Sequence, residues 1–526
     1  MTGYFKMTYE ELVGQKLVWG IDGKRVTPEV VSLFRETHAG GLILFRRNID
    51  SAGGVRKLIS DLEHSLGRRL LIMVDHEGGR VIHLGEGITV FPDAEAAGLA
   101  GHSEWVAQQG EIEAAELRTL GIDLNLAPVL DVLIGAYNPA IGTRSYGRDP
   151  ELVARMGIAR IKGMQSKGLS ACAKHFPGLG AAGFDPHKEL PVIQKTWKVM
   201  KAVDLLPFQK AIEAGVDTVM SSHPVYPELD SSRLPATFSR KIIHDSLRLE
   251  FGFKGAILTD DLKMGAISKS SSFREAVSRA SGAGHDLLLV CSDPKAQRQA
   301  FEGLVWAYRK KELKTDELEA SVERIRQLTS FPRKRESIVD PRLKHAGMTG
   351  DNKSIGGEEL AQKIARGGAK ILGTGKGLLP FSPEGSRDRS LLVLFPDLSP
   401  VAGQFFIEPE LLDPKTFLKR VFLRFGASPK SIETLPLDPG PREREKIKAL
   451  ARSHDLVIFF CSDAHRFKGT RELLKGLEEE GKGLVVILLR EPQDFEWVGA
   501  GTACVTAHGF RATQVEAAVE KLFSPD

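Results

Sequence analysis

Residues 169–180 read LSACAKHFPGLG, a short apolar run that ends in a lysine, a histidine and a turn. A run of this length, stopped by Pro177 and nearby glycines, is typical of a buried strand followed by a tight turn. Such a strand would present Lys174 and His175 at its carboxyl end, which is where α/β barrels carry their chemistry. We therefore expect these two side chains at a functional site.

A second pair of polar residues follows the turn. Asp185 and His187 stand two residues apart, so in extended backbone their side chains would lie on the same face. The carboxylate would then orient the imidazole and stabilise its protonated form, which makes a working acid/base pair. Taken alone, a loop histidine or a lysine is more often a solvated surface residue. It is the clustering of these groups that favours a function.

The first part of the chain, residues 1–328, alternates short apolar runs with longer helical patterns. This alternation predicts βα units that build a parallel sheet. Seven runs are candidate strands, at 41–45, 70–74, 125–130, 171–176, 218–222, 256–259 and 286–290. Seven strands over this length fit a (β/α)8 TIM-like barrel, although on the pattern alone a doubly wound sheet remains an alternative.

The residues that end these runs favour the barrel. Besides Lys174 and His175, the runs lead into side chains able to do chemistry, namely Asp75, Asp131, His223, Asp260 and Asp261. A barrel gathers the carboxyl ends of its strands around one mouth, which would bring these groups together. The alternative is that each aspartate caps the following helix or turn. Capping would explain one or two of them, but it does not easily explain Lys174 and His175.

The pattern breaks after the barrel. Residues 329–353 are basic, carry proline and glycine and have no sustained period, so we expect a solvated linker or insertion rather than a nucleic-acid contact. The segment also resembles translated palindromic repeat elements found inside bacterial reading frames. Residues 354–526 resume with a helical pattern and apolar runs at 391–395, 456–460 and 484–489. They predict a smaller α/β sandwich domain.

The net charge and the cysteines indicate which kinds of partner and cofactor to expect. The chain has 526 residues, with 72 Lys and Arg against 68 Asp and Glu, a net charge of +4 that argues against a polyanion-binding surface. The 4 cysteines are far apart and lie in or beside apolar runs, which favours buried reduced thiols over disulfides or a metal cluster. We therefore expect no metal, no cofactor and no nucleic acid.

The start of the chain predicts the compartment. The first residues lead directly into an amphipathic stretch at 10–18, without the apolar segment of a secretory signal. The longest apolar runs fall far short of the ~20 residues that cross a bilayer. We expect a cytoplasmic monomer without a membrane span.

Several stretches match, in order, the signature stretches of one enzyme family. They include DHEGGRV at 75–81, NLAPVLDV at 125–132, GTRSYG at 142–147, the loop 174–187 and TDDLKM at 259–264. Together they resemble glycoside hydrolase family 3, specifically its β-N-acetylglucosaminidase branch with a His/Asp catalytic dyad. Further matches lie at 40–49, 235–239, 252–255, 368–372 and 378–381. So many matches in one order, covering most of the chain, are a specific signal.

The resemblance implies a role for each polar group. Asp260 would be the nucleophile that forms a covalent glycosyl intermediate, and His187, tuned by Asp185, would be the acid/base. The terminal N-acetylglucosamine would be held by Asp75, Arg144, Lys174 and His175. Independent chemistry agrees in part, because adjacent side chains on a strand point to opposite faces. Only one of Asp260 and Asp261 can then readily face the sugar.

Three positions depart from the family pattern. Leu179 stands where many relatives carry a histidine, and Pro186 replaces a serine or threonine within the acid/base pair. Pro186 fixes its own backbone and restricts Asp185, so a stiffer loop is expected. His83 occupies a place where many relatives present an arginine to the substrate, and we expect it to donate a hydrogen bond there.

The expected function is a retaining exo-β-N-acetylglucosaminidase that removes terminal N-acetylglucosamine from cell-wall muropeptide fragments during recycling. Two alternatives stay open. The first is a phosphorylase of β-N-acetylglucosaminides with the same nucleophile, since a histidine acid/base leaves room for phosphate, which Arg144, Lys174 and His175 could help to bind. The second is a degenerate sugar-binding protein, which the retained Asp260 and His187 disfavour.

Overall fold

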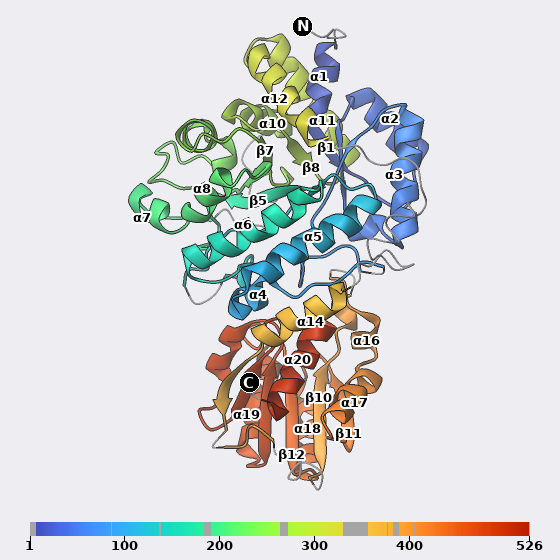
Figure 1. Cartoon of the computed structure of the whole chain (residues 1–526), viewed down its shortest axis with the longest axis vertical. Helices are drawn as coiled ribbons and strands as arrows, with labels where there is room; N and C mark the ends of the chain where they lie inside the picture. Colours follow the sequence, from blue (N-terminus) through green and yellow to red (C-terminus); the bar gives the residue numbers. More distant parts are fainter. Residues whose placement is uncertain are drawn as a thin grey trace. The chain divides into compact units, whose positions relative to one another are not determined.

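The computed structural model describes residues 7–85, 87–135, 138–182, 191–263, 272–329, 356–375, 377–381, 389–402 and 405–524. The chain forms two compact units, shown in Figure 1. Unit 1 comprises Met1–Glu77, His83–Thr89 and Ser103–Gly357, and unit 2 comprises Gly78–Ile82, Val90–His102 and Glu358–Asp526. Unit 2 thus includes two short segments from the first part of the chain. The expected linker at 329–353 lies almost wholly outside the described residues.

Unit 1 is an eight-stranded parallel barrel, as the sequence predicted. The strands are β1 (Leu17–Gly20), β2 (Gly41–Leu44), β3 (Leu71–Val74), β4 (Leu124–Asn125), β5 (Ser170–Phe176), β6 (Thr218–Ser221), β7 (Ala256–Thr259) and β8 (Leu288–Val290). Neighbours follow the order β7-β6-β5-β4-β3-β2-β1-β8. A parallel bridge between Leu258 and Leu287 joins the two ends of this order.

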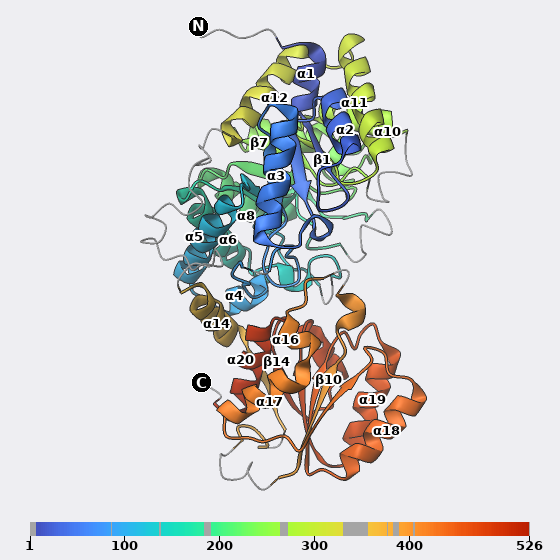
Figure 2. The ribbon, with the colours of Figure 1, turned by 90° about the vertical axis from the view of Figure 1, so that its right-hand side faces the viewer.

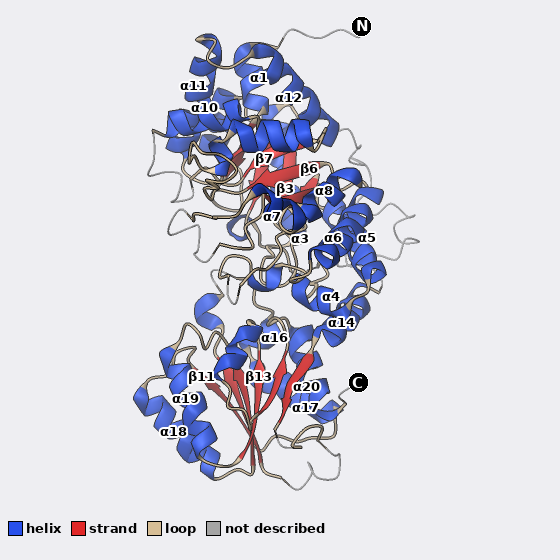
Figure 3. Cartoon of the chain, turned by 90° about the vertical axis from the view of Figure 1, so that its left-hand side faces the viewer, coloured by secondary structure: helices blue, strands red, loops and turns tan. Residues whose placement is uncertain are grey.

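Helices surround the barrel strands, as Figures 2 and 3 show. The α-helices of unit 1 are α1 (Tyr9–Gln15), α2 (Pro28–Thr37), α3 (Ala52–Leu66), α5 (Ser103–Thr119), α6 (Pro150–Ser166), α7 (Trp197–Ala202), α8 (Leu206–Glu213), α10 (Phe273–Ala283), α11 (Pro294–Arg309) and α12 (Thr315–Leu328). A π-helix, Lys241–Glu250, lies between β6 and β7, and short 3-10 turns span Arg46–Asn48, Gly142–Arg144 and Ala236–Phe238.

The sequence encodes several of these helix starts. Thr27 and Asp149 accept hydrogen bonds from the first backbone N–H groups of α2 and α6, and a proline follows each cap. A proline costs nothing at this position because the first N–H groups of a helix have no intrahelical acceptor. Ser51 and Ser272 cap α3 and α10 in the same way.

The barrel interior is packed with apolar side chains. Every second residue of a strand points inward, as for Leu71 and Met73 on β3, and the same period recurs on the other strands. The inward set includes Val18, Ile43, Leu124, Leu126, Cys172, Met220, Ala256, Leu258, Leu287 and Leu289. Because side chains fill the barrel, chemistry is confined to its ends.

Unit 2 is a three-layer α/β sandwich, which confirms the predicted second fold. Its sheet has the order β11-β10-β12-β13-β14-β9, with only β9 antiparallel to its neighbour. The strands are β9 (Lys370–Thr374), β10 (Leu391–Pro396), β11 (Ser431–Leu435), β12 (Leu456–Cys461), β13 (Gly483–Leu488) and β14 (Ala503–Thr506). The helices are α4 (Ala94–Ala100), α14 (Gly357–Gly368), α16 (Pro409–Leu412), α17 (Pro414–Arg424), α18 (Pro441–Arg452), α19 (Lys468–Glu479) and α20 (Ala512–Phe523), with 3-10 turns at Ser399–Val401 and Pro492–Trp497.

Each face of this sheet has its own core. Residues of α17 and α20, such as Leu418 and Val519, pack on one face. Residues of α18 and α19, such as Ile447 and Leu473, pack on the other. Figure 3 shows these two helical layers on either side of the sheet.

The cysteines match a further expectation. Cys172, Cys291, Cys461 and Cys504 are all buried and free. No helix within the described ranges is both long and apolar enough to cross a membrane.

Two glycines let α5 and α6 approach each other closely. A Cβ atom at Gly110 would lie 2.5 Å from the carbonyl oxygen of Arg160, and one at Gly163 would lie 2.2 Å from that of Ala107. Both distances are shorter than a van der Waals contact between carbon and backbone oxygen. The helix pair can therefore keep this spacing only with glycine at both positions.

We expect Gly163→Ala to lower the free energy of unfolding by about 1–3 kcal/mol, because the added methyl group forces the two helices apart. Gly53→Ala is the matched control, since Gly53 is exposed on α3 with no atom closer than 3.9 Å to its added Cβ. That variant should be neutral or stabilising by up to about 1 kcal/mol. Urea unfolding measures both, and equal effects would contradict the close contact.

Candidate active site

Lys174 is the centre of a charged network at the carboxyl ends of the barrel strands. Its Nζ atom lies 2.5 Å from Oδ1 of Asp75, which follows β3, and 2.6 Å from Oε1 of Glu77. The lysine side chain is only 2% exposed. Burial opposes its charge, but Asp75 and Glu77 outweigh burial and raise the pKa of Lys174 to about 12. Lys174 is thus a fixed cation.

Glu77 is shared between two cations. Besides Lys174, it accepts two hydrogen bonds from Arg144, each of 2.8 Å, in a bidentate pair. Burial disfavours the carboxylate, but Arg144 and Lys174 together hold its pKa well below the ordinary range. Glu77 belongs to the DHEGGRV motif at 75–81, but the motif alone predicts no role for it. Its spacing of two from Asp75 was the available signal, since that spacing can place both side chains on one side of the chain.

His175 is oriented by Asp131. Nδ1 of the ring lies 2.7 Å from Oδ2 of Asp131, and Oδ1 of the same aspartate accepts a hydrogen bond of 2.6 Å from the backbone N–H of Leu179. In the neutral ring, Nδ1 then carries the proton and Nε2 is an acceptor, 3.4 Å from a guanidinium nitrogen of Arg144.

An irregularity in β5 brings Lys174 and His175 to the same site. Neighbouring side chains on a regular strand point to opposite faces. The pairing of β5 with β6 shifts register between Lys174 and Phe176, which marks a bulge at His175. A bulge changes the direction in which a side chain points compared with a regular strand. This explains how Lys174 reaches Glu77 while the next residue, His175, reaches Arg144.

Asp260 and Asp261 follow β7 and differ in their surroundings. Oδ1 of Asp261 accepts hydrogen bonds of 3.1 Å from the backbone N–H groups of Lys263 and Cys291, so this side chain ties two loops together. Asp260 has one such bond, from the N–H of Asp261 at 2.7 Å. Burial opposes ionisation of Asp260, but His223 and then His175 outweigh it and lower its pKa. Burial raises the pKa of Asp261.

Two further histidines border the site. Nε2 of His223 lies 3.1 Å from the carbonyl oxygen of Asp261 and must donate to it, which fixes the ring beside Asp260. The ring of His83 packs edge-on against Phe45, with centroids 5.5 Å apart. Burial lowers the pKa of His83, against the opposite influence of Asp75. His83 is therefore neutral at pH 7 and can both donate and accept.

The predicted acid/base pair cannot be placed. Asp185 and His187 fall within 183–190, outside the described residues, so their roles stay predictions. Asp75, Arg144, Lys174 and His175 are linked through the contacts above. Nowhere in the described part of the chain do three His, Cys, Asp or Glu side chains form a group that could hold a metal ion.

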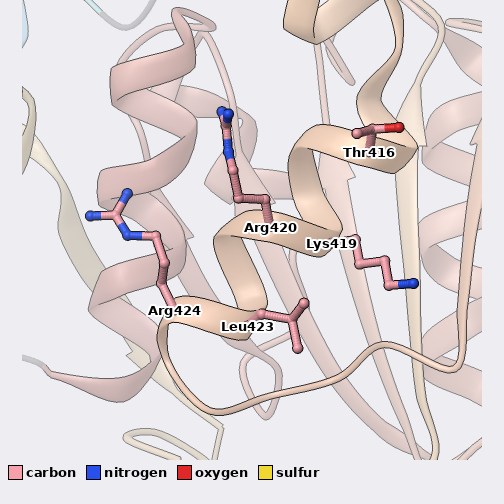
Figure 4. A pocket seen from close by; sticks show the side chains of 5 residues that line it. All are labelled: Thr416, Lys419, Arg420, Leu423 and Arg424. Atoms are coloured by element: carbon pink, nitrogen blue, oxygen red, sulfur yellow. The ribbon is translucent and has the colours of Figure 1, made fainter.

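A hollow on unit 2 does not compete with this site. Figure 4 shows that its lining side chains, Thr416, Lys419, Arg420, Leu423 and Arg424, all project from α17. None of them is a carboxylate or a histidine, so the hollow lacks the two residue types that the sequence predicts for the nucleophile and the acid/base.

The barrel sequence matches a known family over its whole length. Residues 8–328 match the glycosyl hydrolase family 3 N-terminal domain. The chain belongs to glycosyl hydrolase family 3. It is therefore a glycoside hydrolase, and the barrel corresponds to the family's N-terminal domain.

The chain is also similar to individual proteins and solved structures. A β-hexosaminidase from Hydrogenovibrio crunogenus is 34% identical over 308 residues, which cover 56% of this chain and 85% of that protein. The structure of a family 3 β-N-acetylglucosaminidase from Paenibacillus sp. FPU-7 has a TM-score of 0.87 and 29% identity, and the match covers 98% of this chain and 97% of that one. A β-glucoside phosphorylase shares the fold, with a TM-score of 0.80 at 21% identity over 98% of this chain and 92% of that one.

Glu77→Gln should lower the free energy of unfolding by about 3 kcal/mol at pH 7, because it leaves two buried cations short of a counter-charge. Since the folded-state pKa of Glu77 is depressed, its stabilisation is present above the unfolded value of about 4.3 and is lost as pH falls through the folded value. The difference between wild type and variant should therefore be constant from about pH 5 to pH 8 and shrink below about pH 4.

Urea unfolding across this pH range makes the measurement. Asp61→Asn is the control, because Asp61 pairs with Lys57 on the surface, where its side chain is 45% exposed. An exposed pair contributes less than about 1 kcal/mol. A Glu77→Gln effect no larger than that of the control would contradict the shared-charge interpretation.

Proposed function

We propose that the protein is a retaining exo-β-N-acetylglucosaminidase, with a covalent intermediate on Asp260 and His187 as the acid/base, assisted by Asp185. The observation that carries the proposal is the ionised Asp260 at the mouth of a family 3 barrel, beside the network of Lys174, Asp75 and Glu77. The names of the relatives, β-hexosaminidase and β-N-acetylglucosaminidase, support the choice of sugar.

Asp260 has the properties that a glycosidase nucleophile needs. Its depressed pKa keeps it anionic at pH 7, so it can attack the anomeric carbon and form a glycosyl ester. Asp261 uses its carboxylate to hold the backbone of Lys263 and Cys291, which leaves it little freedom to react.

His187 would protonate the leaving oxygen and then activate the water that hydrolyses the ester. An imidazole with a pKa near 6.5 can do both at neutral pH. Because it is neutral as a base, it also avoids repulsion from the anionic Asp260.

The charged network suits a sugar. Asp75 offers acceptors for hydroxyl hydrogens, whereas Lys174 and Arg144 offer charged donors for hydroxyl and acetamido oxygens. The mutual ion pairs hold these groups in place before the sugar arrives, so binding costs less side-chain entropy. Terminal N-acetylglucosamine on cell-wall muropeptide fragments, met in the cytoplasm during recycling, is the substrate that we propose.

A phosphorylase is the second candidate, and the cations Lys174 and Arg144 are the observation that favours it. Incubation with a nitrophenyl N-acetylglucosaminide, with and without inorganic phosphate, separates the two. A hydrolase releases free N-acetylglucosamine at the same rate in both cases. A phosphate-dependent rate with a sugar 1-phosphate as product would overturn hydrolysis, and no turnover in either case would favour a sugar-binding protein.

Asp260→Ala should lower kcat by about 10⁴-fold or more, the scale on which other hydrolases lose activity without their nucleophile. In the wild type, a slow fluorinated sugar substrate should leave a glycosyl adduct on Asp260, which peptide mass spectrometry locates. Asp261→Asn is the control and should still form this adduct. An adduct on Asp261, or none on any carboxylate, would overturn the assignment.

His187→Ala should slow hydrolysis most for substrates with poor leaving groups, because good ones need no proton in the first step. We expect a loss of about 10²-fold or more in kcat/KM for an alkyl glycoside and a much smaller loss for a dinitrophenyl glycoside. Steady-state kinetics with both substrates makes the comparison. Equal losses would count against the acid/base role of His187.

A further inference from the structure

We propose that Arg160 and Glu113, a buried ion pair on α6 and α5, are positioning residues for the sugar-binding loop at residues 75–77. The inference rests on the proposed function, because it gives the pair a share in binding N-acetylglucosamine. Neither residue belongs to the sites assigned above, and neither has a contact with Lys174 or Arg144 among the hydrogen bonds described.

Arg160 holds the backbone of the loop from the helical side. One guanidinium nitrogen donates to the carbonyl oxygen of Glu77 at 2.6 Å, and another donates to that of His76 at 3.0 Å. The planar guanidinium can bridge two successive carbonyl groups, which the single ammonium of a lysine cannot do with the same geometry. The fork thus fixes the orientation of both peptide groups.

Glu113 fixes Arg160 in turn. Its two carboxylate oxygens accept hydrogen bonds of 3.0 and 2.8 Å from Arg160, and Gln109 donates a third at 2.9 Å. Arg160 and Glu113 are each only 1% exposed. Burial opposes the charge of Arg160, but Glu113 outweighs it and raises the pKa of the guanidinium. Arg160 therefore stays charged and keeps all its donors.

The close contact between α5 and α6 determines the distance between Glu113 and Arg160. Gly110 and Gly163 allow α5 and α6 to pack with their backbones almost in contact, one helical turn from Glu113 and Arg160. At this spacing the glutamate and the arginine can form a bidentate pair. A wider helix spacing would separate them and withdraw the guanidinium from the loop.

A second clamp acts on the same loop from the end of β4. Asn125 at the end of β4 accepts from the N–H of His76 at 3.0 Å and donates to its carbonyl oxygen at 2.9 Å. The backbone of His76 is therefore held by both Asn125 and Arg160. The residues before and after it, Asp75 and Glu77, are the two that pair with Lys174.

The fixed backbone determines where these two carboxylates lie. A displacement of about 1 Å in a binding group can cost about 10²-fold in rate, and here it would also open the ion pairs with Lys174. A mobile loop would have to be ordered each time a sugar binds, which weakens binding. The ion pair of Arg160 and Glu113 on the outer helices thus contributes to the affinity for the sugar.

Arg248 provides a matched comparison within unit 1. It too donates to two backbone carbonyl oxygens, those of Phe253 at 2.8 Å and Gly255 at 2.7 Å, and it pairs with a buried carboxylate, that of Asp286, at 2.7 Å. These carbonyl groups precede β7 and so lie at the amino end of the barrel, where residues serve stability. The two arginines differ mainly in the loop that they hold.

The experiment compares Arg160→Lys with Arg248→Lys. KM and kcat are measured with a nitrophenyl N-acetylglucosaminide, Kd for N-acetylglucosamine is measured by calorimetry, and Tm is measured for each variant. Both variants should lower Tm. Arg160→Lys should also raise KM and Kd by about tenfold or more, with kcat changed by less than about threefold, whereas Arg248→Lys should leave KM and Kd unchanged.

A double variant keeps the proposal testable if the lysine variant does not fold. Arg160→Met with Glu113→Leu removes both charges together, so no unpaired charge remains in the core and folding is retained. It should show the same rise in KM and Kd. Unchanged KM and Kd in a folded variant at Arg160, an equal rise in Arg248→Lys, or failure of both Arg160 variants to fold would overturn the positioning role. A wild type without activity on the glycoside would instead overturn the proposed function.

Discussion

The sharing of Glu77 between Lys174 and Arg144 is the interaction on which the site depends. Two cations and a carboxylate are all largely buried there, and each alone would be costly to remove from water. Together with Asp75 the charges of these four side chains balance, so they can offer strong hydrogen-bonding groups without a net charge among themselves. The balance requires β3, β5 and the turn at Gly142–Arg144 to meet at one edge, which is what a closed parallel barrel provides.

Much of the fold followed from the sequence, and the failures have physical causes. The barrel was predicted because polar residues end its apolar runs. Each of the seven predicted runs overlaps a strand, although the run at 125–130 shares only Asn125 with β4. The first strand, β1 (Leu17–Gly20), was missed because it follows α1 after a single residue. The stretch at 10–18 was accordingly interpreted as one amphipathic segment. In unit 2, β9, β11 and β14 were missed, and Lys370–Thr374 is a half-exposed antiparallel edge strand without an apolar run.

The sequence predicted most residues of the site but not the ion pairs between them. Strand ends and motifs indicated Asp75, Lys174, His175 and Asp260, yet nothing in the order of residues indicates that Glu77 bridges Lys174 and Arg144. The burial of Arg160 and Glu113 could not be predicted from the sequence, for a different reason. A charged residue on a helix usually faces solvent, and only the tertiary packing of α5 on α6 shows that these two are buried. The roles of Asp185 and His187 rest on their spacing in the sequence and on the family resemblance.

Unit 2 contains two segments that lie within the barrel sequence. The chain therefore cannot be divided into its two units at a single point. Gly78–Ile82 and Val90–His102 are synthesised long before the sandwich sheet, yet they cluster with it. Arg80 pairs with Glu491 at 3.0 Å, and Glu95 pairs with His508 at 3.1 Å. On the ribosome, these early segments emerge without their partners and must wait for the last part of the chain. A gene shortened after the barrel would remove Glu491 and His508, so the ion pairs that Arg80 and Glu95 make with them would be lost together with the sandwich.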